Sequence, residues 1–422
     1  MTRPAPRPRR RLTARDLAVV PPEIRPLVVA QLTRRGVLRG AGALGIGAFL
    51  AACGTGGGTG GGGGSAGGTA SPGLTPATDL SDSEKVVNWA NWTLYLDQDD
   101  DGTYPSLVAF TEQTGIEVNY SEDIDGNDTY YGKIQGQLAN GDDIGQDIVV
   151  FTDWMAARMI RQGYTQELDE ANMPNKENIL PELAQVDFDP GRKHSLTWQS
   201  GFAGIAWNVE RVGEMRSVSD LWRPEIKGRV EVLDEMRDTM GLIMLEQGVD
   251  ISGDWGEDEF GAALEVLEEQ ISSGQIRQVR GNSYKEDLIS EDALAVIGWS
   301  GDITQLNFEN GEKWAFAIPE AGGTLWSDNM LVPIGSPHKK NAETLMNYCY
   351  DPEVAATVAA WVNYISPVQG AREAMEAIDP ELVDNPLIFP TEEYLQNVRV
   401  FRSLDPGEEQ QYNADFQAVI GN

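Results

Sequence analysis

From residue 86 onward the chain alternates short β-patterned runs with helix-patterned segments, and this alternation constrains the fold more than any other feature. The run VVNWANW at 86–92 is rich in the β-branched and aromatic residues that favour strands. The segment SLVAFTEQTG at 106–115 has helical apolar spacing and ends at a glycine. The pattern continues with expected strands over 116–122 and 147–153 and expected helices over 130–143 and 154–163. Such alternation predicts an α/β fold with a mostly parallel sheet.

The same alternation returns after residue 228. The sequence predicts strands over 228–236, 293–302, 313–319 and 329–335, a helix over 258–274, and mainly helices in the last hundred residues. A chain of 422 residues exceeds one compact core, so we expect two lobes. Ligands of open α/β sheets bind beyond the carboxyl ends of the strands. The segments that fall at such ends are 92–95, 152–154, 235–238 and 299–302.

The first residues have the pattern of an export signal. Arg34 and Arg35 precede a mildly apolar stretch over 41–52, which is typical of a Tat-type signal and too short to span a bilayer. The stretch ends in LAAC, which resembles a bacterial lipobox with Cys53 as the lipidated residue. We predict a Tat-type lipoprotein signal over 1–53, a flexible Gly-rich linker over 54–83, and an extracytoplasmic protein held at the membrane by its lipid alone. The alternative is an unlipidated protein with an internal linker.

The charge of the chain is strongly asymmetric. Residues 1–52 hold ten of the 32 basic residues and two of the 66 acidic ones, so the remainder has 22 basic and 64 acidic residues, a net charge of −42. Such a surface repels nucleic acid, whose binding requires basic residues. It can steer cationic solutes toward a cleft. Solubility in salt explains the same charge, so the charge permits a cationic ligand without proving one.

Motifs for catalysis or metal binding give little support to an enzyme. The sequence has no HExxH or CxxC motif, and its two histidines, His194 and His338, lie far apart. We therefore predict no catalytic residue, metal site or cofactor. The run DQDDDG at 97–102 matches the first half of a calcium loop, but Val108 stands where the closing glutamate is needed, so we expect a solvated acidic turn. Cys349 is expected to be a buried thiol.

Five segments occur in an order that is similar to a known family. They are NWTLYL at 91–96, TEQTGIEVNYSE at 111–122, DLWRPEIKGRVEVLD at 220–234, IGWSGD at 297–302 and EAGGTLWSDNMLVP at 320–333. Together they resemble the spermidine/putrescine-binding subunits of ABC importers, the periplasmic polyamine-binding family, from about Val86 to the C-terminus. The resemblance implies a two-lobed, type II-like α/β solute-binding fold with a hinge between the lobes. Lobe one would combine 84–199 with 326–364, and lobe two 204–317 with 370–422.

The resemblance also implies a ligand site of aromatic and acidic side chains. Aromatic rings can contact the methylenes of a polyamine and attract its charge, and carboxylates can replace the water around a buried ammonium. On chemistry alone, a tryptophan on a strand is more often a core residue, and hydroxyls and acids often cap helices. The positions that match the family's binding residues are Trp92, Thr93, Tyr95, Thr152, Trp154, Glu235, Asp238, Trp299, Asp302, Trp326, Asp328 and Tyr364.

Departures from the family pattern bear on the choice of solute. Leu94 stands where spermidine binders can carry an acid, and Asp302 is an acid that they lack, so putrescine is favoured over spermidine. Arg402 falls where a glutamine contacts ligand in the family; it either pairs with an acid such as Asp405 or indicates a different solute.

The resemblance implies a monomeric binding protein that is not an enzyme and that delivers a polyamine to an ABC permease and its ATPase. The alternative is a lipid-anchored protein of the same fold that serves in sensing or binds a different small solute. Both readings place the protein outside the cytoplasm.

Overall fold

The computed structural model describes residues 73–99 and 101–421. Residues 73–97 and those from Pro105 onward form one compact body, and residues 98–104 belong to a separate unit. The predicted export signal, Cys53 and the linker up to residue 72 lie outside the described residues. Among the described residues, no helix combines the length and the apolar character that a membrane span requires.

The strands of the body form one mixed sheet. Its order is β2-β1-β3-β9-β4-β7-β5-β6, with β10 paired to β9 and β8 paired to β4. Pairing is parallel among β1, β2 and β3 and among β5, β6 and β7. Strands β4 and β9 pair antiparallel with each other; β4 also pairs antiparallel with β7, and β9 with β3. The strands are β1 (Val86–Trp92), β2 (Glu117–Ile124), β3 (Ile148–Thr152), β4 (Ser195–Asn208), β5 (Val230–Leu233), β6 (Ile276–Arg280), β7 (Ala295–Trp299), β8 (Trp314–Ala317), β9 (Gly323–Leu331) and β10 (Val398–Arg399).

Helices follow most strands, as expected for an α/β chain. The α-helices are α2 (Pro105–Thr114), α3 (Asn127–Asn140), α4 (Asp153–Arg161), α5 (Val209–Val212), α6 (Met236–Glu246), α7 (Glu257–Ser272), α8 (Tyr284–Ile289), α9 (Ser300–Asn310), α10 (Lys339–Cys349), α11 (Pro352–Val362), α12 (Ala371–Ile378), α13 (Glu392–Leu395) and α14 (Pro406–Ile420). Short 3₁₀ turns are η2 (Glu170–Asn172), η3 (Pro174–Asn178), η4 (Val218–Trp222) and η5 (Pro224–Ile226).

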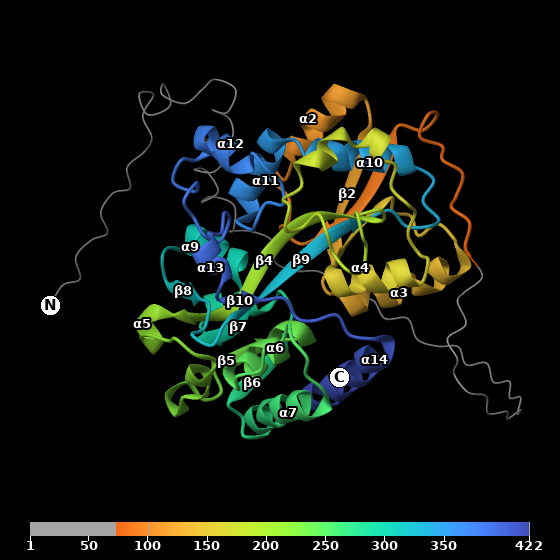
Figure 1. Cartoon of the computed structure of the whole chain (residues 1–422). Helices are drawn as coiled ribbons and strands as arrows, with labels where there is room; N and C mark the ends of the chain where they lie inside the picture. The colour runs from red at the N-terminus through yellow and green to blue at the C-terminus, as the bar shows by residue number, and fades with distance from the viewer. Residues whose placement is uncertain (1–72, 100, 422) are drawn as a thin grey trace, which may run out of the picture. The chain divides into compact units, whose positions relative to one another are not determined.

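The alternation predicted from the sequence is confirmed, but the expectation of a mostly parallel sheet is wrong for its centre. Strand β4 is buried along its whole length and pairs with β7, β8 and β9, all antiparallel. The strand expected over 329–335 already begins at Gly323 and ends at Leu331. Strands β4 and β9 lie side by side in the middle of the body (Figure 1). Their relative direction and their lengths are therefore set by pairing between segments far apart in the chain, which a local sequence pattern does not show.

Two separate hydrophobic cores flank these central strands. One core is built from residues of 203–314 and 401–416, including Met240 in α6 and Phe416 in α14. The other is built from residues of 90–164 together with Leu331, and includes Met155 in α4. Figure 1 shows β4 and β9 running between the part that holds α3 and α4 and the part that holds α6, α7 and α14. The predicted buried thiol of Cys349 is confirmed, because its side chain is buried in α10.

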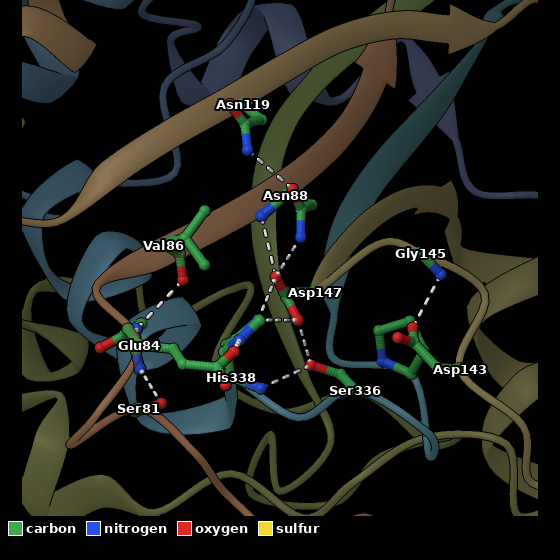
Figure 2. A network of polar contacts seen from close by, with 12 residues as sticks. Ser81, Glu84, Val86, Asn88, Asn119, Asp143, Gly145, Asp147, Ser336 and His338 are labelled. Atoms are coloured by element: carbon green, nitrogen blue, oxygen red, sulfur yellow. Dashed lines mark hydrogen bonds and ion pairs between the residues drawn. The ribbon is translucent and has the colours of Figure 1, made fainter.

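A polar network lies around the start of β1 (Figure 2). The nearly buried His338 ring contacts carboxylates at both nitrogens, with Nδ1 3.0 Å from Asp147 Oδ2 and Nε2 2.9 Å from Glu84 Oε2. Asp147 also accepts from the backbone and side-chain amides of Asn88 and from the Ser336 hydroxyl. Burial by itself lowers the pKa of His338, but these two carboxylates outweigh it and raise the pKa above its ordinary value. The network joins the start of β1 to the turn before α10.

Candidate functional site

A cavity of about 590 Å³ lies in the body and is lined by every residue that the sequence proposed for ligand contact. Those residues come from the carboxyl ends of β1, β3 and β7, from β9, from the first turns of α4, α6 and α9, and from the segment after α11. Its volume falls in the range of about 300–1,000 Å³ that is common for small-molecule sites. The tertiary structure therefore gathers all twelve positions around one space: Trp92, Thr93, Tyr95, Thr152, Trp154, Glu235, Asp238, Trp299, Asp302, Trp326, Asp328 and Tyr364.

Asp328 is held in the cavity by two hydroxyl groups. The antiparallel register of β3 and β9 pairs Thr152 with Asp328, and the Thr152 hydroxyl donates to Asp328 Oδ1 over 2.7 Å. The Tyr95 hydroxyl donates to Asp328 Oδ2 over 2.9 Å. Among the described residues, no lysine or arginine forms an ion pair with this carboxyl. Burial raises the pKa of Asp328 to about 7, against the lowering effect of the two hydroxyls.

Aromatic rings surround this carboxyl. The rings of Tyr95 and Tyr364 meet edge to face with centroids 5.5 Å apart, and those of Tyr364 and Trp326 are 5.2 Å apart. Gly201 in β4 permits this packing, because a Cβ there would lie 2.5 Å from Trp326 and 2.8 Å from Tyr364. Likewise, a Cβ at Gly301 would lie 2.7 Å from the ring of Tyr364. Contacts shorter than 3 Å exclude a side chain, so the glycines are required for the close approach of the rings.

The segment after β1 brings Trp92 and Thr93 to the cavity wall. The Trp92 indole donates to the carbonyl of Val150 over 3.1 Å, which fixes the ring against β3. Leu94 adopts a φ of 59°, a left-handed conformation that is rare for a residue with a side chain. Its amide donates to Glu122 Oε1 over 3.1 Å. Strained backbone of this kind is concentrated at functional sites, and here it turns Tyr95 toward Asp328.

A second buried acid, Asp238 in α6, is held by groups from two other elements, β7 and β9. The Trp299 indole donates to Asp238 Oδ2 over 2.8 Å, and the Thr324 hydroxyl donates to Asp238 Oδ1 over 2.6 Å. Burial raises the pKa of Asp238 from its ordinary value. The indole of Trp299, at the end of β7, is therefore oriented by Asp238 of α6.

Asp302 differs from these two acids because it already has a cation. Lys285 lies 3.1 Å from Asp302 Oδ1, and the hydroxyls of Tyr284 and Tyr364 donate to the same carboxylate at 2.8 and 3.2 Å. The side chain of Lys285 is mostly buried, so this pair is screened little by water. A ligand ammonium at Asp302 would therefore compete with Lys285.

The ring of Trp154 is already contacted by two arginines. The guanidinium carbons of Arg237 and Arg158 lie 4.2 and 4.9 Å from the centre of its ring. Arg237 and Arg158 both contact the buried carboxylate of Glu409, as does Arg161. The ring lines the cavity, but arginines already occupy cation–π positions on it.

Glu235 connects the two sides of the cavity through Asn127. Asn127 Nδ2 donates to the Thr152 hydroxyl oxygen at 2.9 Å and lies 3.4 Å from Glu235 Oε2. Burial raises the pKa of Glu235 to about 8, although Arg237 opposes this shift. A row of polar groups thus leads from Asp328 through Thr152 and Asn127 to Glu235.

Arg402 lines the cavity and pairs with an acid, although that acid is not Asp405. Its guanidinium forms a two-point contact with Glu408, at 2.7 and 2.9 Å, and lies 4.2 Å from the ring of Trp255. Asp405 instead caps the first turn of α14 through the amides of Gly407 and Glu408. The pKa of Glu408 is lowered by Arg402, so the pair is ionised.

Sequence reasoning missed several side chains of this cavity or its immediate surroundings. Asn127 follows β2, so the rule that ligands bind beyond strand ends contained a signal for it. Arg237 lies between Glu235 and Asp238 in the sequence, and both were proposed as ligand-binding residues, so its position was a signal for it. Lys285 and Glu409 had no local signal, because they reach the site only through tertiary packing.

Comparisons with known proteins bear on the family and the fold of this chain. A family model described as bacterial extracellular solute-binding protein matches residues 106–390. The spermidine/putrescine-binding periplasmic protein 1 of Haemophilus influenzae is 26% identical over 309 residues, which cover 72% of this chain and 81% of that protein. The putrescine-binding periplasmic protein PotF of Escherichia coli is 26% identical over 347 residues, 78% of this chain and 89% of that protein.

Solved structures show the same fold. A putative spermidine/putrescine ABC transporter protein from Listeria monocytogenes has a TM-score of 0.69 at 25% identity, covering 80% of this chain and 99% of that one. A spermidine/putrescine substrate-binding protein from Streptococcus pneumoniae, in complex with calcium and HEPES, has a TM-score of 0.65 at 26% identity and covers 80% of this chain and 98% of that one. The expected two-lobed α/β fold and the family resemblance are both confirmed. The chain belongs to the bacterial extracellular solute-binding protein family.

Proposed function

We propose that this protein binds a linear polyamine between its two lobes, with putrescine favoured over spermidine, and delivers it to the permease of an ABC importer. The relatives named for spermidine and putrescine binding support this solute class. The protein acts as a binding component without catalysis, as a monomer, with the energy supplied by the ATPase of the importer.

The observation that carries the proposal is the environment of Asp328. This carboxyl is buried among aromatic rings and, within the described part of the chain, receives only hydroxyl donors, from Tyr95 and Thr152. A buried carboxylate without a cation is costly, and a ligand ammonium removes that cost through a charge-assisted hydrogen bond. The rings of Trp326 and Tyr364 supply apolar surface for methylenes and attraction for the charge.

The lobes of this proposal are 84–199 with 326–364, and 204–317 with 370–422. The two hydrophobic cores support the division, because one draws on 90–164 with Leu331 and the other on 203–314 with 401–416. A solute that contacts both lobes favours the closed arrangement by its additional contacts. The proposal also includes the Tat-type signal over 1–53, lipidation of Cys53 and a Gly-rich linker over 54–83, which keep the protein at the outer face of the membrane.

Isothermal titration of the purified protein with putrescine, spermidine and spermine tests the proposal, with glutamate as the control solute. We expect one binding site, the tightest binding for putrescine, and no heat with glutamate. At a hundredfold excess of solute over its dissociation constant, the free energy of unfolding should rise by about 2.7 kcal/mol. Absence of binding for all three amines would contradict the proposed function.

A further inference from the structure

Two buried acids of the cavity, Asp328 and Asp238, are attached to the same face of β9. Asp328 belongs to β9, and Asp238 accepts a hydrogen bond from Thr324, four residues earlier on that strand. Alternate side chains of a strand point to one side, so Thr324, Trp326 and Asp328 share a face. Among the described residues, neither acid forms an ion pair, and Arg237, next to Asp238 in the chain, pairs with a carboxylate of α14 instead. The cavity therefore has two places for an ammonium group.

A third buried acid, Asp302, differs because both oxygens of its carboxylate already accept hydrogen bonds. Oδ1 accepts from the Lys285 ammonium at 3.1 Å and from the Tyr364 hydroxyl at 3.2 Å, and Oδ2 accepts from the Tyr284 hydroxyl at 2.8 Å. The side chains of Lys285 and Asp302 are 15% and 6% exposed, so water screens their attraction little. An ammonium group of the solute reaches this carboxylate only in competition with Lys285.

The ion pair lies at the wall between the main cavity and a smaller one. The smaller cavity has a volume of about 310 Å³. Four residues line both spaces, namely Thr93, Leu94, Asn282 and Asp302. Of the two spaces, Lys285 lines the smaller one. Lys285 therefore reaches Asp302 from the side of the smaller cavity, where a solute that extends out of the main cavity would pass.

We propose that Lys285 is a specificity-determining residue that limits the solute to two ammonium groups. The two ammonium groups of a diamine are served by Asp328 and Asp238, with the ring of Trp326 beside the methylenes. An aminopropyl arm that extends into the smaller cavity carries a third ammonium past Asp302, where the charge of Lys285 repels it. This inference rests on the proposed function and gives a physical cause for the preference for putrescine over spermidine.

Three amines separate the effect of charge from the effect of length in isothermal titrations. Putrescine has two ammonium groups, and spermidine is putrescine with an added aminopropyl arm. N-butylputrescine has the length of spermidine but ends in a methyl group. We expect wild-type protein to bind N-butylputrescine at least tenfold more tightly than spermidine, because Lys285 does not repel a methyl group. A smaller difference would overturn the inference, because the third ammonium is then tolerated.

The variant Lys285→Met removes the charge and keeps the length of the side chain. It frees one position on the Asp302 carboxylate, so a third ammonium can take the place of the lysine. We expect spermidine to bind this variant at least tenfold more tightly than wild type, whereas putrescine and N-butylputrescine change by less than threefold. Lys285→Gln should act in the same way. Lys340→Met is the matched control, because Lys340 forms an exposed ion pair with Asp82.

A double variant shows whether the gain depends on the acid. In Lys285→Met combined with Asp302→Asn, the gain for spermidine should disappear. A gain that persists in the double variant, or that is absent from both single variants, overturns the role of Lys285. If putrescine binds wild type without these differences, the inference fails and the proposed function stands. If no amine binds wild type or Lys285→Met, both fail. The wild-type comparison of spermidine with N-butylputrescine decides the matter even if the variants do not fold.

Discussion

Thr152 and Asp328 lie opposite each other on β3 and β9, and their side chains are joined by a hydrogen bond of 2.7 Å. The pair sits where an apolar strand ends and the cavity begins. The hydroxyls of Thr152 and Tyr95 orient the carboxylate while leaving its charge unbalanced. Solute affinity should therefore change when the Asp328 carboxylate is replaced, when it is protonated, and when the rings around it are displaced.

Replacing the carboxylate is the most direct test. We expect Asp328→Asn to weaken putrescine binding at least tenfold, because the amide keeps the shape but removes the attraction for an ammonium. Titration calorimetry measures the change, and circular dichroism checks the fold. Asp384→Asn is a matched control, because the Asp384 side chain is 89% exposed at the surface. Unchanged binding by Asp328→Asn would remove this residue from the site.

Binding should depend on pH through the same carboxyl. Its pKa is about 7 in the free protein, and a bound ammonium favours the ionised form, so binding lowers this pKa and releases a proton. Affinity should therefore fall as the pH drops below 7, approaching about tenfold per pH unit. Titrations at pH 6 and 8 in buffers of different ionisation enthalpy measure the released protons; heats that are independent of the buffer at pH 6 would contradict this prediction.

The close approach at Gly201 can be tested by adding one methyl group. The Cβ of Gly201→Ala would lie 2.5 Å from Trp326, so the ring must shift and carry Tyr364 with it. We expect putrescine affinity to fall at least tenfold and the tryptophan fluorescence to change. Gly132→Ala is the control, because no atom lies within 4 Å of its added Cβ. Wild-type affinity in Gly201→Ala would show that the ring positions do not matter for binding.

Glu409 joins α14 to arginines of both α4 and α6. Because α4 packs in one hydrophobic core and α14 in the other, this contact stabilises the arrangement in which the two cores approach each other. We expect Glu409→Gln to increase the dissociation rate of putrescine several-fold, since less of the protein is closed. Stopped-flow tryptophan fluorescence measures this rate. Asp415→Asn, an exposed change on the same helix, should leave it unaltered; equal rates for wild type and Glu409→Gln would argue against the role of this contact in closure.

His338 should make stability depend on pH. Its folded-state pKa is raised above the ordinary value of 6.5 by Glu84 and Asp147, so its contribution is complete below about pH 6.5 and is lost as the pH rises through the raised value. We expect His338→Gln to lower the free energy of unfolding by about 1–3 kcal/mol at pH 6 and by less at pH 9. Urea unfolding at the two pH values tests this. His194→Gln is the matched control, and an effect of His338→Gln that is equal at both pH values would contradict the charge argument.

The elements with strong local patterns were accessible from the sequence. The apolar run of β3, the glycine after α2 and the strand of β7 depend on residues close together in the chain, so periodicity and capping predicted them. The twelve site positions were named from family motifs, and the structure brings all of them to one cavity. Their roles in binding remain predictions until solutes are measured.

What the sequence by itself determined is the order of strands and helices and the positions at strand ends where chemistry is concentrated, because both follow from neighbouring residues. Only the tertiary structure decided the antiparallel centre formed by β4 and β9 and the cations near the acids, Lys285 beside Asp302 and Arg237 beside Glu409. The physical reason is that register and ion pairing join segments far apart in the chain. A local pattern shows that a strand or a charge exists, but the partner it meets is chosen by the packing of the whole body.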